Sequence, residues 1–424
     1  MAHIGRRRLL AGAAGLLAAG AAAGPARAAR ETGVERRTGG PGRSPAAPAA
    51  PAEFRGMWIA SVENVDWPSK SGLSADRQRA ELLALLDTAV ERRLNAVVLQ
   101  VRPAADALWP SPLEPWSQWL TGTQGRDPGW DPLGTAVAAA HERGLELHAW
   151  FNPYRVANHT DPDRLADTHP ARRNPEWVVA YGGKLYYNPG MPEVRRFVQD
   201  AMADAVARYP VDGVHWDDYF YPYPVEGEDF DDDAAFEEYG GAFDSRADWR
   251  RDNTDTLVRE MSERLRRIRP AVRFGVSPFA VWRNDDVDPR GSRTRAGVGT
   301  YDDLYADTRK WVKERWIDYI VPQAYWQLGH PSADYAEIVP WWARTVAGTG
   351  VSLYVGEALY RCDADSTTEA WRDPAELSRH VSFAKGYPEV RGHVYFSAKQ
   401  VVADPNGAMA RVVADHYPTP VPPR

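Results

Sequence analysis

The chain of 424 residues contains one cysteine, Cys362, and no excess of basic residues. One cysteine cannot form an internal disulfide, so the stability of the fold has to come from a large apolar core. The formal net charge is -7, with 51 Lys and Arg against 58 Asp and Glu. Because nucleic-acid binding needs a basic face, this balance excludes nucleic acid as an expected partner.

Motifs for a catalytic metal are also lacking. No HExxH occurs, and His148 and His215 fall on different predicted strands. The acidic run EGEDFDDDAAFEE, residues 226–238, invites a calcium interpretation, but it lacks the turn glycine and terminal glutamate of an EF-hand at the required spacing. We therefore expect a solvated acidic loop, no metal and no cofactor. The same lack of a metal triad argues against a polysaccharide deacetylase.

The first 29 residues have the composition of an export signal. Arg6, Arg7 and Arg8 precede the apolar run LLAGAAGLLAAGAAAG, which leads to the small residues Ala26 to Ala28. This order predicts a cleaved signal peptide of the twin-arginine type over residues 1–29, and hence a secreted, extracellular or wall-associated protein without membrane association after cleavage. An uncleaved membrane anchor is the alternative, disfavoured because glycine and alanine are weakly hydrophobic for a spanning helix.

Residues 30–52 contain the stretch TGGPGRSPAAPAAPA, which has no large apolar residue and cannot build a core. We interpret this segment as a disordered linker and residues 418–424 as a C-terminal tail. The folded domain is therefore expected over residues 53–417. The sequence makes no prediction of the oligomeric state.

From Phe54 onward, apolar runs of strand length alternate with helical patterns. The eight predicted strands are RGMWIAS (55–61), NAVVLQVRP (95–103), LELHAWFNP (145–153), DGVHWDD (212–218), RFGVSPF (273–279), IDYIVPQAYW (317–326), SLYVGEALY (352–360) and GHVYFSA (392–398). Helical spacing of apolar residues marks 79–93, 131–144, 192–209 and 253–268. Eight strand-then-helix units predict a closed parallel TIM (β/α)8 barrel. A doubly wound open sheet is the alternative, but no glycine-rich loop follows the first strand.

In such a barrel, chemistry is expected at the carboxyl ends of the strands. The predicted strand 212–218 ends in His215, Asp217 and Asp218. Side chains alternate along a strand, so His215 and Asp217 share one face and Asp218 takes the other. The segment D-G-x-H-x-D is also similar to the fourth-strand motif of the alpha-amylase clan, whose last aspartate is the nucleophile. We therefore assign Asp217 as nucleophile or charge stabiliser, with a purely structural carboxylate as the alternative.

Glycoside hydrolysis commonly needs a second carboxyl group that is protonated. Candidates at the same barrel end are Asp218, Glu357, Asp106 and Glu63. Glu357, within LYVGEALY, is the preferred general acid, because apolar surroundings raise the pKa of a carboxyl group. Aromatic residues in the predicted loops, including Tyr219, Tyr325 and Trp326, suit the apolar faces of sugars, with core packing as the alternative for about half of the set.

Long segments of the chain resemble the glycosyl-hydrolase-like 10 domains of bacterial cell-envelope proteins. The resemblance is carried by FRGMWIASVENVDWPS (54–69), QVRPAADALWPSPLEPWSQWLTGTQG (100–125), LHAWFNPYR (147–155), DGVHWDDYFYP (212–222), FGVSPFAVWRN (274–284), DYIVPQAYW (318–326) and LYVGEALYR (353–361). These segments are spread over almost the whole chain that follows the predicted linker.

The resemblance implies a TIM barrel that hydrolyses glycosidic bonds in a bacterial cell-wall polysaccharide, above all in peptidoglycan glycan strands without stem peptides. It also implies a set of site positions, namely Arg102, Asp106, Asn152, Tyr154, Asp217, Asp218, Gln323 and Tyr325. We further expect His215, Tyr219 and Trp326 to bind substrate. The alternative is a non-catalytic barrel that only binds wall polysaccharide.

Overall fold

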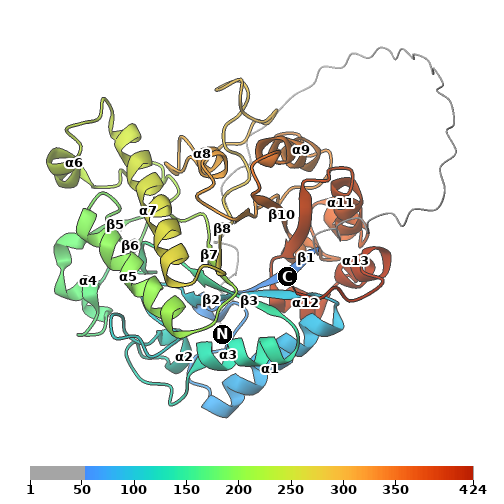
Figure 1. The fold of residues 1–424 in the computed structure, drawn as a ribbon, viewed down its shortest axis with the longest axis horizontal. Helices are drawn as coiled ribbons and strands as arrows, with labels where there is room; N and C mark the ends of the chain where they lie inside the picture. Colours follow the sequence, from blue (N-terminus) through green and yellow to red (C-terminus); the bar gives the residue numbers. More distant parts are fainter. Residues whose placement is uncertain (1–52, 424) are drawn as a thin grey trace, which may run out of the picture. The chain divides into compact units, whose positions relative to one another are not determined.

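The computed structural model describes residues 53–423, which fold around a closed barrel of eight parallel strands (Figure 1). The barrel strands are β1 (Phe54–Ile59), β2 (Ala96–Arg102), β3 (Glu146–Phe151), β7 (Gly213–Trp216), β8 (Arg273–Val276), β9 (Tyr319–Ile320), β10 (Ser352–Glu357) and β11 (Val390–Tyr395). Neighbouring strands pair in parallel, and β11 pairs with β1 to close the ring. The TIM barrel predicted from the sequence is confirmed.

Helices from the connecting segments surround the strands (Figure 1). They are α1 (Ala75–Glu91), α2 (Gln118–Thr121), α3 (Pro132–Glu142), α4 (Pro170–Arg173), α5 (Pro192–Arg208), α6 (Asp233–Tyr239), α7 (Arg246–Ile268), α8 (Thr308–Lys313), α9 (Tyr335–Val346), α10 (Glu369–Arg372), α11 (Glu376–Ala384), α12 (Ala398–Ala403) and α13 (Ala408–His416). The four predicted helices correspond to α1, α3, α5 and α7. Local chemistry fixes their starts: at α3, the Asp131 side chain accepts a hydrogen bond of 3.0 Å from the Gly134 amide.

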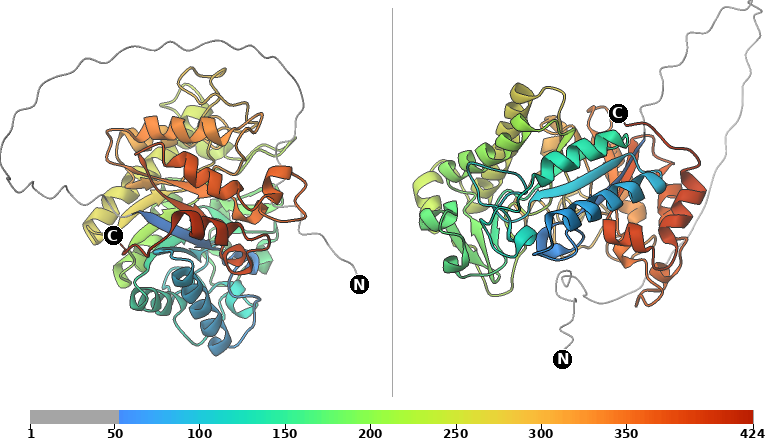
Figure 2. Two further views of the ribbon diagram at one scale, coloured as in Figure 1. Left: turned by 90° about the vertical axis from the view of Figure 1, so that its right-hand side faces the viewer. Right: turned by 90° about the horizontal axis from the view of Figure 1, so that it is seen from below.

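The two ends of the barrel domain lie side by side. Figure 2 shows β1, in blue, against the red C-terminal part of the chain, and Gly56 pairs with Val394 across this seam. The Arg55 side chain also donates a 2.9 Å hydrogen bond to the Thr419 carbonyl. The predicted C-terminal tail, as far as residue 423, therefore contacts the base of β1.

Alternate residues of each strand point into the barrel or toward the helices. The barrel interior holds its own cluster of buried side chains, with Phe54, Trp58, Trp150, Tyr319 and Tyr354 among its members. A much larger apolar cluster fills the layer between the strands and the helices. This alternation decides which polar residues at the strand ends reach the mouth of the barrel.

A three-stranded antiparallel sheet, absent from the sequence predictions, lies between β3 and α5. Its order is β4 (Arg155–Ala157), β6 (Lys184–Tyr187) and β5 (Val178–Tyr181). Gly182 and Gly183 form the turn between β5 and β6 with φ values of 56° and 73°, which glycine adopts without steric cost. Because β4 follows the carboxyl end of β3, this sheet stands beside the barrel mouth.

The predicted signal peptide (1–29) and linker (30–52) lie outside the described residues, so both stay predictions. Among the helices of residues 53–423, none has the length and apolar character needed to cross a membrane.

Candidate active site

Asp217 follows β7 at the carboxyl end of the barrel and is almost completely buried, with 4% of its surface exposed. Its Oδ2 accepts hydrogen bonds from the Trp150 indole, at 3.2 Å, and from the Asn152 side-chain amide. Its Oδ1 accepts a 3.3 Å hydrogen bond from the Tyr219 backbone N–H. Trp150 and Asn152 come from the neighbouring strand β3 and the residue after it, so two adjacent strand ends hold this carboxylate. The alternation that predicted an inward Asp217 is thereby confirmed.

Asp218 forms the second carboxyl group of the site. Its Oδ2 accepts a hydrogen bond from the Tyr223 hydroxyl, and the Gln323 side chain also favours its charged form. Burial, followed by the charge of Asp217, outweighs these bonds and raises the pKa of Asp218 to about 7. Burial also raises the pKa of Asp217, against the opposing charge of Arg155. Since like charges this close resist joint ionisation, the two carboxyls titrate as a pair that shares one proton near neutral pH.

His215 lies in the barrel interior beneath the acid pair and is fully buried. The Trp58 indole donates to its Nε2 at 3.2 Å, so Nε2 is the unprotonated nitrogen. Nε2 also lies 2.8 Å from the Ser277 hydroxyl, and Nδ1 lies 3.1 Å from the Tyr319 hydroxyl. Burial holds the pKa of His215 well below its usual value. Both ring nitrogens of His215 are within hydrogen-bond distance of protein groups. The geometry therefore does not support the predicted contact of His215 with substrate.

Aromatic side chains line the mouth around this pair. Ring centroids lie 5.6 Å apart for Tyr219 and Tyr223, 6.3 Å for Tyr223 and Phe279, and 5.4 Å for Phe279 and Trp326. A second group places Tyr325 at 5.7 Å from Tyr360. All six residues are half-buried and come from the loops after β7, β8, β9 and β10. We call this set the aromatic rim; it offers flat apolar faces next to two carboxyl groups.

Glu357 does not belong to this site. Its carboxylate accepts hydrogen bonds from the Tyr335 hydroxyl at 2.8 Å and contacts Nδ1 of His380 and Nδ1 of His393, each at 2.9 Å. These partners lie on α9, α11 and β11, on the helix side of the barrel wall. Burial alone would raise the pKa of Glu357, but His380 foremost, with His393, lowers it to about 2. The prediction of a raised pKa at Glu357 is therefore wrong, and the group is not protonated at neutral pH.

Three further predicted residues also lie apart from the acid pair. The buried Arg102 forms an ion pair with Glu114, Nε to Oε2 at 2.7 Å, and donates to the Pro153 carbonyl at 3.0 Å. The register of β2 against β3 shifts between Gln100 and Arg102, so alternation along β2 does not carry through to its last residue. Arg102 is thus taken up by structural contacts.

Tyr154 is fully buried in the cluster between strands and helices, and its hydroxyl has no hydrogen-bond partner among residues 53–423. Asp106 is also fully buried, in the loop after β2, where burial above all raises its pKa to about 7. Neither is joined to the acid pair by a hydrogen bond. Substrate contact through Arg102, Asp106 and Tyr154 has no support in this geometry, whereas Gln323, Tyr325 and Trp326 lie at the mouth, where their roles stay predictions.

Sequence reasoning missed Trp150, Tyr223 and Arg155. Trp150 precedes Asn152 by two residues, so alternation along β3 could have placed both on the inward face. Tyr223 belongs to the aromatic run after Asp218, but no pattern in the sequence predicts the hydrogen bond from its hydroxyl to the Asp218 carboxylate. Arg155 follows the end of the predicted strand and lies with its guanidinium carbon 5.3 Å from the ring centroid of Tyr219.

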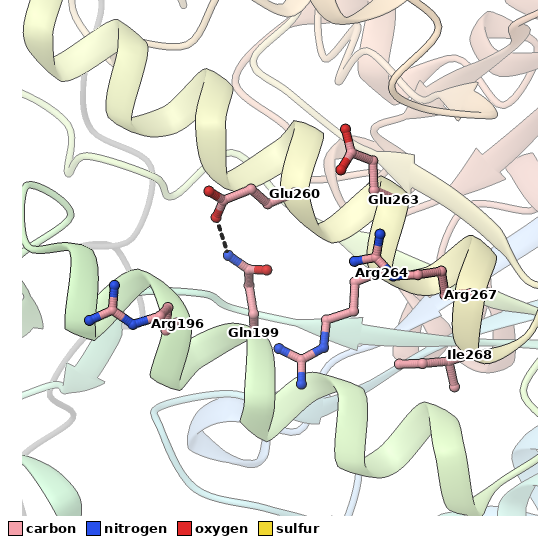
Figure 3. Close-up of a pocket in the computed structure, with 7 residues that line it drawn as sticks. All are labelled: Arg196, Gln199, Glu260, Glu263, Arg264, Arg267 and Ile268. Carbon is pink, nitrogen blue, oxygen red and sulfur yellow. Dashed lines mark hydrogen bonds between the residues drawn. The ribbon is translucent and has the colours of Figure 1, made fainter.

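A surface pocket of about 490 Å³ lies elsewhere, between α5 and the second half of α7 (Figure 3). It is lined by Arg196, Gln199, Glu260, Glu263, Arg264, Arg267 and Ile268. Because the end of α7 leads into the start of β8, this pocket lies toward the end of the barrel opposite the acid pair. Within residues 53–423, no group of three His, Cys, Asp or Glu side chains is arranged to hold a metal ion.

Known proteins resemble this chain over most of its length. The family model described as Glycosyl hydrolase-like 10 matches residues 53–373. Glycosyl hydrolase YngK of Bacillus subtilis (strain 168) is 47% identical over 370 residues, which cover 87% of this chain and 72% of that protein. Glycosyl hydrolase DigH of Escherichia coli (strain K12) is 40% identical over 363 residues, which cover 81% of this chain and 82% of that protein.

Solved structures share the barrel at low sequence identity. The glycoside hydrolase domain of PgaB (BpsB) from Bordetella bronchiseptica aligns with a TM-score of 0.54 and 13% identity, covering 85% of this chain and 98% of that one. Alpha-L-fucosidase isoenzyme 2 from Paenibacillus thiaminolyticus aligns with a TM-score of 0.53 and 12% identity, covering 86% of this chain and 50% of that one. These two likenesses concern the fold. Through the family model and the two curated relatives, the chain belongs to the Glycosyl hydrolase-like 10 family, as the resemblance of its sequence predicted.

Proposed function

We propose that this protein is a secreted glycoside hydrolase that cleaves peptidoglycan glycan strands lacking stem peptides. The observation that carries the proposal is the pair of buried, electrostatically coupled carboxyls, Asp217 and Asp218, at the mouth of a TIM barrel. The names of the relatives, glycosyl hydrolases YngK and DigH, support the reaction class. Export through the segment 1–29 would bring the enzyme to this substrate.

Each carboxyl has a distinct role in the proposed reaction. Asp218, whose raised pKa keeps it largely protonated up to about pH 7, donates its proton to the glycosidic oxygen as the C1–O bond breaks. Asp217, held by hydrogen bonds to its charged form, stabilises the positive charge that develops on the sugar ring, as nucleophile or as electrostatic partner. Water then adds to the anomeric carbon and returns a proton to Asp218.

The aromatic rim supports a carbohydrate substrate. Its rings are half-buried, and the C–H faces of pyranoses pack against flat apolar surfaces of this kind. Tyr325 and Trp326 on the loop after β9, and Tyr219 after β7, are the proposed stacking residues, with the Gln323 amide as a hydrogen-bonding group.

A non-catalytic barrel that binds wall polysaccharide is the competing function. It would be favoured by an Asp217 with no second acid in reach. The structure does provide a second acid close to Asp217. It is Asp218, whose pKa is raised by the charge of Asp217. The coupled pair therefore favours catalysis.

Mass spectrometry of the products from peptide-free and peptide-bearing glycan strands tests the proposal. We expect new reducing ends from the peptide-free strands, and a loss of roughly 10²- to 10⁴-fold in rate for both Asp217→Asn and Asp218→Asn. Asp76→Asn, an exposed acid in the first turn of α1, is the matched control and should retain full activity. Binding of strands without new reducing ends would establish the non-catalytic barrel instead. Full activity in both variants would show that Asp217 and Asp218 do not carry the reaction.

A further inference from the structure

The small sheet beside the mouth presents two cations on one face. Arg155 on β4 lies opposite Tyr186 on β6. Lys184 is two residues before Tyr186 on the same strand, and residues two apart point to the same side of a sheet. Arg155, Tyr186 and Lys184 therefore share one face, and the charges of Arg155 and Lys184 act on each other.

This face is turned toward the loop that carries the acid pair. The Arg155 guanidinium lies over the ring of Tyr219, at 5.3 Å, and its charge stabilises ionised Asp217. Tyr186 packs against Phe230 of the same loop, with ring centroids 6.4 Å apart. Arg155 thus stands next to Asp217, and Lys184 lies on the same face close enough for the charge of Arg155 to act on it.

Neither cation is neutralised by an ion pair. Arg155 is 6% exposed and donates through Nε to the Pro103 carbonyl at 2.9 Å, but across residues 53–423 it forms no salt bridge. Lys184 is half-buried, and the described part of the chain gives its ammonium neither a hydrogen bond nor a salt bridge. Burial and the charge of Arg155 lower the pKa of Lys184, which Glu63 only partly offsets.

Two desolvated, mutually repelling cations without an ion-pair partner are costly. Among the buried arginines of residues 53–423, the other three each have a carboxylate partner: Arg55 has Glu53, Arg102 has Glu114 and Arg250 has Asp232. A ligand that brings a carboxylate to this face would relieve the repulsion and form charge-assisted hydrogen bonds.

We propose that Arg155 and Lys184 form an anion subsite for the carboxylate of the substrate, namely the lactyl ether carboxylate of a muramic acid residue that carries no stem peptide. This inference rests on the proposed function and deepens it. When a stem peptide is attached, the same carboxyl group is an amide without charge, and the subsite has nothing to bind. Arg155 and Lys184 would then be the residues that distinguish peptide-free from peptide-bearing strands.

Four oligomers of matched length test the subsite with the full-length protein. They are alternating N-acetylglucosamine and N-acetylmuramic acid with free carboxylates, the same oligomer with each carboxylate converted to a methylamide, a neutral chitin oligomer, and a hyaluronan oligomer with uronate carboxylates. Lys184→Gln is the decisive variant, because Arg155 also acts on Asp217. Lys385→Gln, an exposed lysine at the end of α11, is the control.

We expect kcat/KM of the wild type to favour the free carboxylate over the methylamide by about 10- to 100-fold, the range of a hydrogen-bonded charge. Lys184→Gln should bring this ratio close to one, and Lys385→Gln should keep it. The ratio is independent of how much of a preparation is folded. Equal rates in the wild type, or an unchanged ratio in Lys184→Gln, overturn the subsite.

Faster cleavage of hyaluronan than of the free muramic oligomer would overturn the lactyl assignment in favour of a ring carboxylate. If the wild type cleaves none of the four oligomers, the proposed hydrolase function is contradicted, but the anion subsite is not yet tested. In that case, calorimetric binding of the free and methylamide oligomers to the Asp218→Asn variant still tests the subsite. Tighter binding of the free carboxylate oligomer, lost when Lys184→Gln is added, supports the subsite. Equal binding of the two oligomers overturns it.

Discussion

The side-chain amide of Asn152 donates a hydrogen bond to Asp217 across the neighbouring strand ends of β3 and β7. Asn152 is itself fixed, because the Gln100 amide donates to its Oδ1 at 2.7 Å, and Gln100 belongs to the next strand, β2. Three adjacent strands therefore position one carboxylate. Burial raises the pKa of Asp217, and the hydrogen bond from Asn152 opposes this rise because it favours the ionised carboxylate.

Replacing Asn152 with alanine should raise the pKa of Asp217, since the donor to its charged form is lost. We expect the acidic limb of the kcat/KM profile to move to higher pH and kcat to fall by about 10- to 100-fold. Stopped assays of reducing ends across the pH range measure both effects. Asn174→Ala, which removes a loop amide bonded to the Pro170 carbonyl, is the control. An acidic limb that does not move would show that Asp217 is not the ionised group.

Tyr223→Phe should act on the opposite limb. The Tyr223 hydroxyl stabilises the charged form of Asp218, so its removal raises the pKa of Asp218 further. A general acid with a higher pKa stays protonated to higher pH, and the alkaline limb of kcat/KM should move upward while the acidic limb stays in place. A shift of the acidic limb alone would reverse our assignment of the two carboxyls.

Glu357→Gln should destabilise the fold without affecting catalysis. Removing one member of a buried ionic network typically costs about 3 to 5 kcal/mol in the free energy of unfolding, and urea titration measures it. Because the pKa of Glu357 is about 2 in the fold against an ordinary 4.5, its contribution is present above about pH 4.5 and is lost as the pH falls toward 2. The stability difference between wild type and variant should therefore shrink on acidification.

The control for this experiment is Glu369→Gln, an exposed acid at the start of α10. Hydrolysis by Glu357→Gln should match the wild type under conditions where both are folded. A large loss of kcat in the folded variant would restore Glu357 as the general acid.

Trp326→Ala should weaken substrate binding. Loss of one stacking face at the rim is worth roughly 0.5 to 1.5 kcal/mol, which predicts an increase in KM of about 2- to 10-fold with little change in kcat. Trp316→Ala provides the matched control, since this half-buried tryptophan precedes the start of β9 and lies at the other end of the barrel. Equal effects of both substitutions would indicate a general loss of stability.

The barrel could be predicted because each strand is a continuous apolar run and the helices between them show regular apolar spacing. The site was harder to predict. Alternation placed Asp217 inward, and the same rule along β10 would have grouped Glu357 with Leu353 and Val355, away from the inward Tyr354. The prediction of Glu357 as general acid rested on its apolar neighbours in the sequence. It left out the direction in which the side chain points from the strand. It also left out the histidine partners, which lie 23 and 36 positions further along the chain.

Asp218 shows where the alternation rule ends. β7 stops at Trp216, so Asp218 belongs to the following loop, and its contacts with Tyr223 and Gln323 follow from the loop conformation. The small sheet carried a readable signal, two glycines between the apolar runs VVAY and KLYY, which is typical of a tight hairpin. The position of Arg155 over the ring of Tyr219, with Lys184 on the same face of the sheet, depends on how that sheet packs, which no local pattern encodes.

The pH dependence of kcat/KM on peptide-free glycan strands tests the acid pair most directly. With a charged Asp217 and a protonated Asp218, the account predicts a bell-shaped profile whose alkaline limb has an apparent pKa of about 7 and belongs to the pair. A rate that stays constant from about pH 6 to about pH 9 would contradict it, because no proton held by Asp218 would then be needed for the reaction.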